Sequence, residues 1–362
     1  MKWARTTARS PYMEYAKLYS GARYNLAASG IASYPLSELP VQLKDLQING
    51  ETIYGYAPLQ ERLARKNDVA PECIVAAAGT SMANHLAMAA TLNPGDEVLM
   101  EHPTYELLVS LAGYLGAAIR FFERKVETGF RLDPEEVARK ITSSTRLVVI
   151  TNLHNPSGAF TDNETLAAVG KIASRVDARV LVDEVYLETL FEQRPRPAFH
   201  LGNEFIVTNS LTKAYGLSGL RCGWVIAEPA LAERMWRLND LFAATPVHIG
   251  ELLSVIALDN LDKVAARAKK VLEINRVQLN SFLDQHEAWL ECVRVEHGTV
   301  AFPRLRSGNA NGFCERLKTD YETSVAPGRF FDMPEHFRIG IGGEAEMTAQ
   351  GLQRIGQALR SQ

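Results

Sequence analysis

The sequence predicts an α/β protein, with a large domain built on a mostly parallel seven-stranded sheet between helices and a smaller α+β domain. Seven short, mainly apolar runs lie between residues 73 and 227 and alternate with helical patterns. Because these runs lack the polar alternation of half-exposed strands, they are typical of strands buried on both faces of a parallel sheet. After Pro229 the pattern changes to a long helical stretch followed by alternating segments, which indicates a second domain.

Local signals place the elements in order. The segment PLQERLARK has Leu59 and Leu63 four residues apart, as on one face of a helix. In DPEEVARKI, Asp133 is a suitable N-cap and Pro134 suits the first helical position. The expected strands are CIVAAAG, EVLMEHPTYE, AAIRFFE, RLVVITN, ARVLVDEVY, EFIVTNS and GLRCGWVIA. The later part is expected to contain a long helix at 260–286, strands in CVRVEHGTVAFPRL and HFRIGIGG, and a final helix in EMTAQGLQRIGQALRSQ.

Composition limits the function classes. The 362 residues are 46% hydrophobic and 22% charged, with a formal net charge of −3, so nothing favours nucleic acid or anionic lipid as a partner. No apolar run approaches the roughly 20 residues that span a bilayer, and the N-terminus lacks the apolar core of a signal peptide. The four cysteines form no CxxC pair, which indicates a reducing compartment and no metal site. We expect a cytoplasmic protein.

Polar or aromatic groups directly follow five of the predicted strands. Ligands of an open α/β sheet bind at the carboxyl ends of its strands, so these groups should meet in one cavity. Chance could place one or two such groups, but five in order indicate a constructed site. In chain order they are Gly79, Thr80 and Ser81, then Tyr105, then Asn155, then Asp183 with Tyr186, and finally Lys213.

This set matches the needs of pyridoxal 5'-phosphate. The aldehyde of that cofactor needs a lysine for a Schiff base, and Lys213 is available. Asp183 would pair with the pyridine nitrogen, and Asn155 and Tyr186 would bond to the phenolate oxygen. Tyr105 would stack on the ring. The phosphate needs a helix N-terminus, hydroxyl groups and a cation, a role that fits Gly79, Thr80, Ser81, Ser210 and Arg221.

Over nearly its whole length the chain resembles the fold type I pyridoxal-phosphate enzymes, specifically the class I/II aminotransferases. The turn NPSG is similar to the family's NPTG turn and contains Asn155, and VDEVY is similar to its D-x-x-Y strand. The block SLTKAYGLSGLRCGW, with Thr212 beside Lys213 and Arg221 eight residues later, resembles the S-x-[ST]-K…R-x-G motif. The resemblance implies an aspartate-aminotransferase-like large domain and adds Thr212 to the cofactor-binding residues.

The resemblance also implies substrate and subunit contacts. FRIGIGG resembles the segment whose arginine binds the substrate carboxylate, which assigns Arg338, and LAASGI resembles the segment whose glycine lies beside the substrate, which assigns Gly30. YGYAPLQERLA resembles a segment in which a tyrosine, here Tyr54 or Tyr56, reaches the neighbouring subunit's phosphate in a homodimer. The expected organisation is an N-terminal segment shared with the small domain and active site (1–50), a large cofactor-binding domain (51–245) and a small domain (246–362).

The implied function is an aminotransferase acting on an amino acid and a 2-oxo acid. Freed Lys213 would move the α-proton as a general base, and a cationic neighbourhood would lower its pKa. Dicarboxylate-specific members carry a further arginine after the lysine block. LFAATPVHIGELL contains none, only His248, so aspartate specificity is not expected.

Two alternatives remain. The same fold hosts β-lyases and cyclases, and YNLAASGIASYPLSEL is similar to the start of capreomycidine synthase. A ligand-sensing module of a transcription regulator is the alternative from another class, but the chain has no N-terminal helix-turn-helix pattern.

Overall fold

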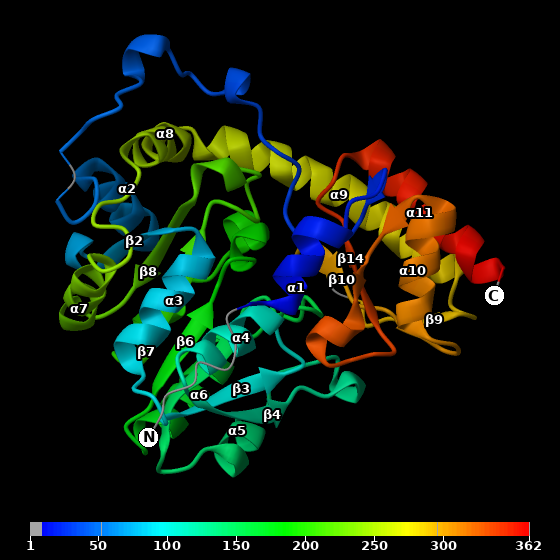
Figure 1. The fold of residues 1–362 in the computed structure, drawn as a ribbon, viewed down its shortest axis with the longest axis horizontal. Coiled ribbons are helices and arrows are strands. Elements are labelled where there is room, and N and C mark those ends of the chain that lie inside the picture. Colours follow the sequence, from blue (N-terminus) through cyan, green and yellow to red (C-terminus); the bar gives the residue numbers. More distant parts are fainter. Residues whose placement is uncertain (1–8, 52, 295, 362) are drawn as a thin grey trace.

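The computed structural model describes residues 9–51, 53–294 and 296–361. At its centre lies a seven-stranded sheet in the order β2-β8-β7-β6-β5-β3-β4 (Figure 1). Only β8 pairs antiparallel with its neighbours β2 and β7, so the predicted mostly parallel seven-stranded sheet is confirmed. The strands are β2 (Ile74–Ala78), β3 (Glu97–His102), β4 (Ala118–Glu123), β5 (Thr145–Thr151), β6 (Arg179–Asp183), β7 (Phe205–Ser210) and β8 (Cys222–Ile226).

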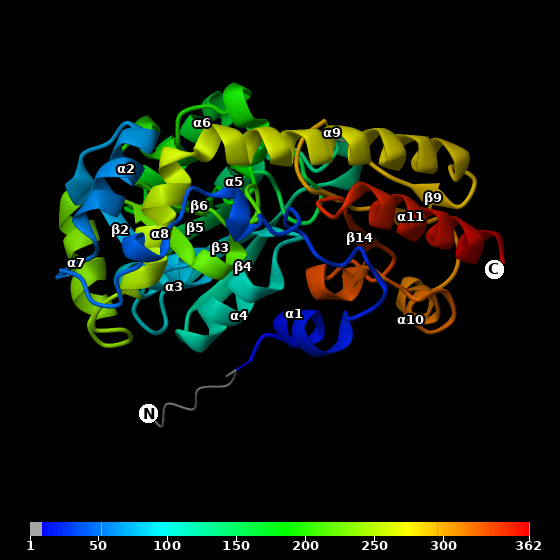
Figure 2. The same ribbon diagram turned by 90° about the horizontal axis from the view of Figure 1, so that it is seen from above.

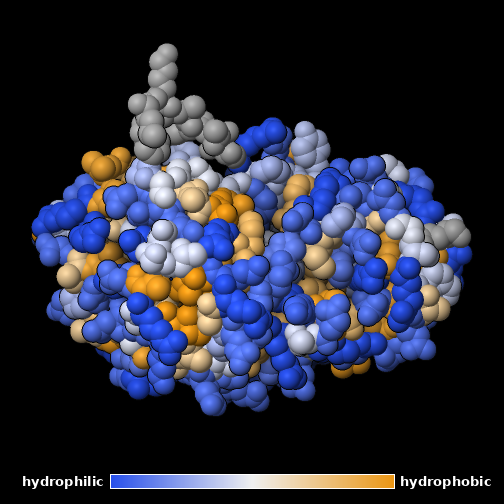
Figure 3. All heavy atoms as spheres, turned by 90° about the horizontal axis from the view of Figure 1, so that it is seen from below, coloured by the Kyte–Doolittle hydropathy of each residue, from blue (hydrophilic) through white to orange (hydrophobic). Residues whose placement is uncertain are grey.

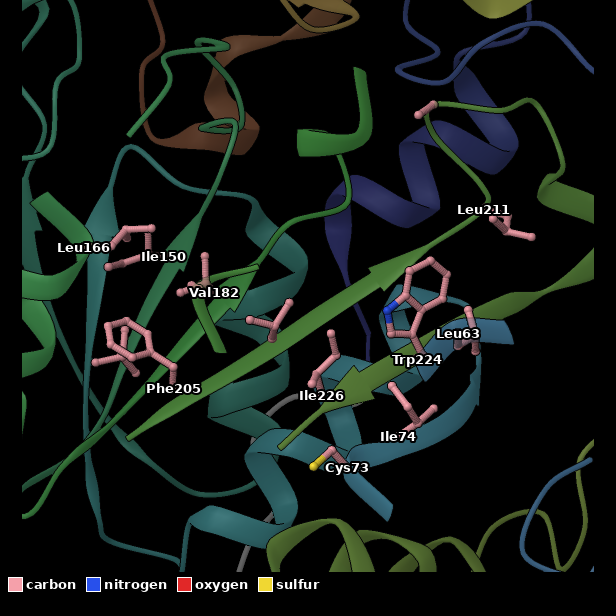
Figure 4. Close-up of a cluster of buried hydrophobic side chains, with 14 of the residues drawn as sticks. Leu63, Cys73, Ile74, Ile150, Leu166, Val182, Phe205, Leu211, Trp224 and Ile226 are labelled. Carbon is pink, nitrogen blue, oxygen red and sulfur yellow. The ribbon is translucent and has the colours of Figure 1, made fainter. Parts of the chain in front are cut away.

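Successive residues of these strands are buried on opposite faces of the sheet. In β5, Val148 packs into one core cluster with Leu166 of α6, whereas Val149 packs into another with Leu86 of α3. Figure 4 shows the first cluster, in which Trp224 and its neighbours cover one face. Both faces are apolar because helices cover both, namely α2 (Ala57–Asn67), α3 (Thr80–Thr91), α4 (Glu106–Tyr114), α5 (Pro134–Lys140), α6 (Asn163–Ser174), α7 (Pro229–Asn239) and α8 (His248–Asp259).

A separate core lies to the other side of the molecule. The long helix α9 (Leu261–Gln285) extends from one half of the molecule to the other in Figures 1 and 2. Its Val264 packs into the core of the large sheet, and its Ala268 and Leu272 pack into the second core. Other elements of the second half include α10 (Ala310–Tyr321), α11 (Ala345–Arg360), β10 (Val300–Ala301), β12 (Thr323–Ser324), β13 (Ala326–Pro327) and β14 (Phe337–Gly340).

The N-terminal segment joins both halves. It begins with α1 (Pro11–Glu14), which continues as a wider helical turn (Tyr15–Tyr19), and then forms β1 (Tyr24–Asn25) beside β12. Beyond β1 the backbone bonds to the second half through Leu26 and to the large half through Ile31. The segment therefore lies between the two cores and is positioned by both.

The strands expected within 292–305 are confirmed only in the second half of this range, where β10 (Val300–Ala301) and β11 (Arg304–Leu305) form. Apart from residue 295, which lies outside the described residues, 292–299 contain no strand. Only two-residue strands form at β9 (Leu290–Glu291), β10 and β11 (Arg304–Leu305). The alternation of valines was misleading because only short stretches find a partner strand: β10 pairs with β14, and β9 pairs with β11. The remaining short turns are Leu36–Glu38, Leu43–Asp45, Pro71–Cys73, Val126–Thr128, Leu187–Gln193, Ala198–Leu201, Ser218–Leu220 and Gly328–Phe331.

The surface carries both hydrophilic and hydrophobic residues. On the face shown in Figure 3, hydrophobic residues form separate patches within a mostly hydrophilic surface. Within the described part of the chain, every helix is too short or too polar to cross a membrane.

Candidate active site

A cavity of about 420 Å³ lies at the carboxyl ends of the sheet strands. Two walls contribute to it, one from the strand ends of the large half and one from residues 12–31 of the N-terminal segment. Most of the residues predicted from the sequence line it, namely Gly30, Thr80, Ser81, Tyr105, Asn155, Asp183, Tyr186, Ser210, Thr212, Lys213 and Arg221. Gly79 and Arg338 do not line the cavity directly, but each contacts a residue that does.

Lys213 reaches the cavity from the loop after β7. Its Nζ donates a hydrogen bond to Ser29 Oγ at 3.0 Å. Burial lowers the pKa of the Lys213 amine below its ordinary value, and the positive charges of Arg338 and Arg221 add to this effect. The direction is the one expected from the sequence, although burial rather than nearby charge is the largest cause. A lysine with a lowered pKa has a larger fraction of neutral, nucleophilic amine near neutral pH.

Asp183 ends β6 as a buried carboxylate, 3% exposed. Asn84 Nδ2 donates to its Oδ2 at 2.8 Å, and the Val185 N–H donates to its Oδ1 at 3.1 Å. Thr208 Oγ1 donates to Asn84 Oδ1, so the Asn84 amide presents its NH₂ to Asp183. Burial raises the pKa of Asp183 to about 6, which leaves this carboxylate in need of a positive partner.

The N-terminus of α3 forms an anion-binding corner. Its N-cap, Gly79, has φ +80°, and a Cβ there would lie 2.2 Å from Arg221 Nη2. Glycine therefore allows the guanidinium to lie against the helix end, where it donates to Ala78 O at 3.0 Å. The buried Thr80 hydroxyl has no hydrogen-bond partner among the described residues. A helix N-terminus, a cation and an unpartnered hydroxyl together suit a phosphate.

Arg338, in β14, is fully buried. Its Nη1 donates to Asn155 Oδ1 at 2.8 Å and its Nη2 donates to Tyr12 OH at 2.6 Å. Its Nε has no partner, and no carboxylate among the described residues forms an ion pair with it. A buried cation is costly unless it is paired, so this guanidinium is suited to an incoming carboxylate. The bond from Arg338 also leaves the NH₂ of Asn155 able to donate elsewhere.

Two tyrosines complete the walls. The Tyr186 hydroxyl donates to Ser29 Oγ at 2.8 Å. Tyr105 lines the cavity, and its ring meets Tyr12 edge-on at 5.4 Å between centroids. Burial raises the pKa of both Tyr105 and Tyr186, so both phenols remain protonated donors at neutral pH.

Tyr54 and Tyr56 lie outside this cavity. The Tyr54 hydroxyl donates to Asp240 Oδ2 at 3.2 Å and accepts a bond from Arg237. The ring of Tyr56 packs edge-on against His248 at 5.0 Å. Neither tyrosine lines the cavity of its own subunit, so a role for either would require a second copy of the chain.

The cavity residues that were missed from the sequence include Ser29, Asn84 and Tyr12. Ser29 stood next to the selected Gly30, and Asn84 lies one helical turn after Thr80, so a search of neighbouring positions could have found both. Tyr12 carried no such signal, because only the packing of α1 brings it to Arg338. No group of three or more His, Cys, Asp or Glu side chains in the described ranges is arranged to hold a metal ion.

Known proteins resemble this chain over almost its full length. Residues 47–355 match the family model described as aminotransferase class I and II. Capreomycidine synthase from Streptomyces vinaceus is 28% identical over 94% of this chain and 91% of its own length. Arginine–pyruvate transaminase from Pseudomonas aeruginosa is 27% identical over 95% of this chain and 92% of its own length.

The similarity extends to three dimensions. A solved structure of a PLP-dependent aminotransferase from Streptococcus suis superposes with a TM-score of 0.92, covers 98% of each chain and is 26% identical. The family match spans both halves of the molecule and every strand-end residue of the cavity. The chain therefore belongs to the class I and II aminotransferases, a family of fold type I enzymes that depend on pyridoxal phosphate.

Proposed function

We propose that the protein is an aminotransferase that moves an amino group between an amino acid and a 2-oxo acid. The observation that carries this proposal is the position of the Lys213 amine in one cavity with a buried carboxylate, Asp183. The guanidinium of Arg338, which has no carboxylate partner among the described residues, lies just behind the cavity wall. The anion corner at Gly79, Thr80 and Arg221 supports the same assignment. These groups fit pyridoxal phosphate because each provides an unmet charge or hydrogen bond that the cofactor or substrate would satisfy.

When bound, the cofactor supplies an aldehyde that captures amino groups and a ring that withdraws electrons from the α-carbon. Lys213 Nζ would hold the cofactor covalently and, once displaced, would take the α-proton and return it. Asp183 would keep a proton on the ring nitrogen. Asn155 would donate its NH₂ to the phenolate oxygen, and Arg338 would bind the substrate carboxylate through its planar fork.

The proposed donor is an amino acid with a single carboxylate. In the described part of this subunit, Lys213 and Arg221 are the Lys and Arg side chains that line the cavity, Arg338 lies just behind its wall, and each has a role above. No further cation is left for a side-chain carboxylate, and His248 packs against Tyr56 instead of lining the cavity. A panel of amino donors tests this, with aspartate and glutamate expected to be poor substrates.

The central test is Lys213→Ala. The variant is expected to lose the absorbance band near the visible edge that borohydride removes, and to lose turnover by at least about 100-fold. Lys171→Ala, on the exposed side of α6, is the matched control and should keep both. Wild-type turnover in Lys213→Ala would refute the assignment.

A lyase or cyclase reaction is the second candidate, and the similarity to capreomycidine synthase over 94% of the chain favours it. The two reactions differ in their products. With an amino acid alone, transamination releases at most one equivalent of 2-oxo acid per site and no ammonia. Continued turnover without an oxo acid, with ammonia or a cyclised product, would establish the second candidate instead.

We also propose a homodimer that uses the surface around Tyr54. The side chains of Ile48, Ile53, Leu241 and Val247 near this surface are between 73% and 88% exposed. Such exposed apolar side chains are typical of a contact surface, and the Tyr54–Asp240 bond brings the two segments together. Sedimentation velocity should give twice the mass of one chain, and a monomer at micromolar concentration would contradict the proposal.

A further inference from the structure

Ser29 lies between two proposed active-site residues, Lys213 and Tyr186. Its Oγ accepts one hydrogen bond from Lys213 Nζ at 3.0 Å and another from Tyr186 OH at 2.8 Å. The residue is 6% exposed and lines the cavity. Both of its lone pairs are therefore directed at proposed active-site residues, and its own proton remains available.

The backbone around Ser29 is fixed from both halves of the molecule. On one side, Ile31 N–H donates to Lys213 O at 2.9 Å. On the other, Thr299 Oγ1 donates to Ser29 O at 2.7 Å. The fit is close, because a Cβ on Gly340 would lie 1.8 Å from Ala28 O. The Ser29 hydroxyl is thus a positioned acceptor rather than a mobile surface group.

A fixed acceptor has a direct consequence for a neutral amine. A primary amine has two N–H groups and one lone pair in a tetrahedral arrangement. When one N–H donates to Ser29, the lone pair points away from Ser29. A general base works only if its lone pair reaches the proton that it removes, so this orientation matters for the proton transfer assigned to Lys213.

We propose that Ser29 is a positioning residue that orients the free Lys213 amine and the Tyr186 hydroxyl during proton transfer. This inference rests on the role of Lys213 proposed above. The other charged or titratable groups that act on Lys213 come from α1 (Tyr12), β6 (Asp183), the turn before β8 (Arg221) and β14 (Arg338). Ser29 differs from all of them because it bonds directly to Nζ and carries no charge.

Three substitutions of Ser29 test the proposal. Ser29→Ala removes the acceptor, Ser29→Cys keeps the size but offers only a weak acceptor, and Ser29→Thr keeps the hydroxyl. We expect kcat to fall about tenfold or more in the Ala and Cys variants, with KM for the amino acid little changed and kcat largely retained in the Thr variant. Ser254→Ala is the control, since this buried hydroxyl lies outside the cavity and bonds to Gly250 O in its own helix.

A second measurement does not depend on turnover. In cofactor-free protein, the rate of condensation with pyridoxal phosphate as the probe follows the neutral fraction of Lys213. Loss of an acceptor for the charged ammonium should move the midpoint of this rate profile down by about one pH unit in the Ala and Cys variants. A purely structural role of Ser29 would not produce that shift. The probe itself titrates identically in all variants.

The outcomes separate the two proposals. If the Cys and Thr variants have equal kcat and equal midpoints, the role of Ser29 is refuted while Lys213 keeps its own. If wild-type protein forms no borohydride-sensitive band but Lys213→Ala turns over normally, the proposed function itself fails. Wild-type kcat and an unchanged midpoint in Ser29→Ala would also overturn the positioning role.

Discussion

Two fully buried arginines lie in contrasting surroundings. Arg124, at the end of β4, donates to Glu101 Oε2 at 2.8 Å, to Phe130 O at 2.7 Å and to Thr161 Oγ1 at 3.2 Å. Glu101 in turn accepts two bonds from Thr151. Arg338 is equally buried, but its partners are neutral and its Nε has none.

The charge of Arg124 is paired with a carboxylate within the fold, whereas the charge of Arg338 is hydrogen-bonded only to neutral groups. A buried ion pair in which every guanidinium nitrogen has a hydrogen-bond partner contributes to the structure and has little capacity for a ligand. A buried cation without a counter-ion is retained at a cost, and such groups cluster at functional sites. Burial and residue type alone therefore do not separate the two arginines, whereas the presence or absence of a carboxylate partner among the described residues does.

The largest expected effect is on stability, at the satisfied pair. Arg124→Met should reduce the free energy of unfolding by about 3–5 kcal/mol, because it leaves Glu101 buried without a counter-charge. Denaturant titration at neutral pH measures this. The double variant Arg124→Met with Glu101→Gln should recover a large part of the loss. A cost below about 1 kcal/mol in the single variant would remove the contrast with Arg338.

The corresponding substitution at Arg338 should weaken the use of substrate and leave the free energy of unfolding nearly unchanged. Arg338→Met is expected to lower kcat/KM for amino acids about 100-fold, since a planar charged contact to the carboxylate is lost. An amine that lacks the carboxylate is the matched control substrate, and its kcat/KM should hardly change. Equal losses for both substrates would indicate that Arg338 serves the structure as Arg124 does.

A smaller effect should appear at Asp183, the open negative charge. Burial raises its pKa in the folded protein to about 6 from the ordinary 3.8, so the folded cofactor-free protein binds more protons than the unfolded chain between these two pH values. Its stability contribution is therefore fully present below pH 3.8 and is lost as pH rises through 6. As the pH rises from 5 to 8, the free energy of unfolding of Asp183→Asn should increase relative to that of wild type by on the order of 1 kcal/mol. A difference that is independent of pH would mean that Asp183 is not strained by burial.

The sequence by itself determined the large sheet and the residues at its strand ends. Apolar runs without polar alternation predict strands buried on both faces, and parallel strands end at one edge. Asn155, Asp183 and Lys213 could therefore be expected in one cavity before any coordinates were known. The two-residue strands β9 to β13 could not, because pairing with distant segments and not local pattern selects them: β10 and β13 pair with β14, β9 pairs with β11, and β12 pairs with β1.

Only the tertiary structure determines the second wall of the cavity, which residues 12–31 of the N-terminal segment form opposite the strand ends. Tyr12 reaches Arg338 because α1 packs against α4, where Tyr12 N–H and Ser10 bond to Glu106. Ser29 meets Lys213 because the chain beyond β1 is held between β14 and the loop after β7. These contacts join residues that are far apart in the sequence and come from segments without periodicity. No local propensity encodes them, since they arise only when the two cores have formed and the N-terminal segment is packed between them.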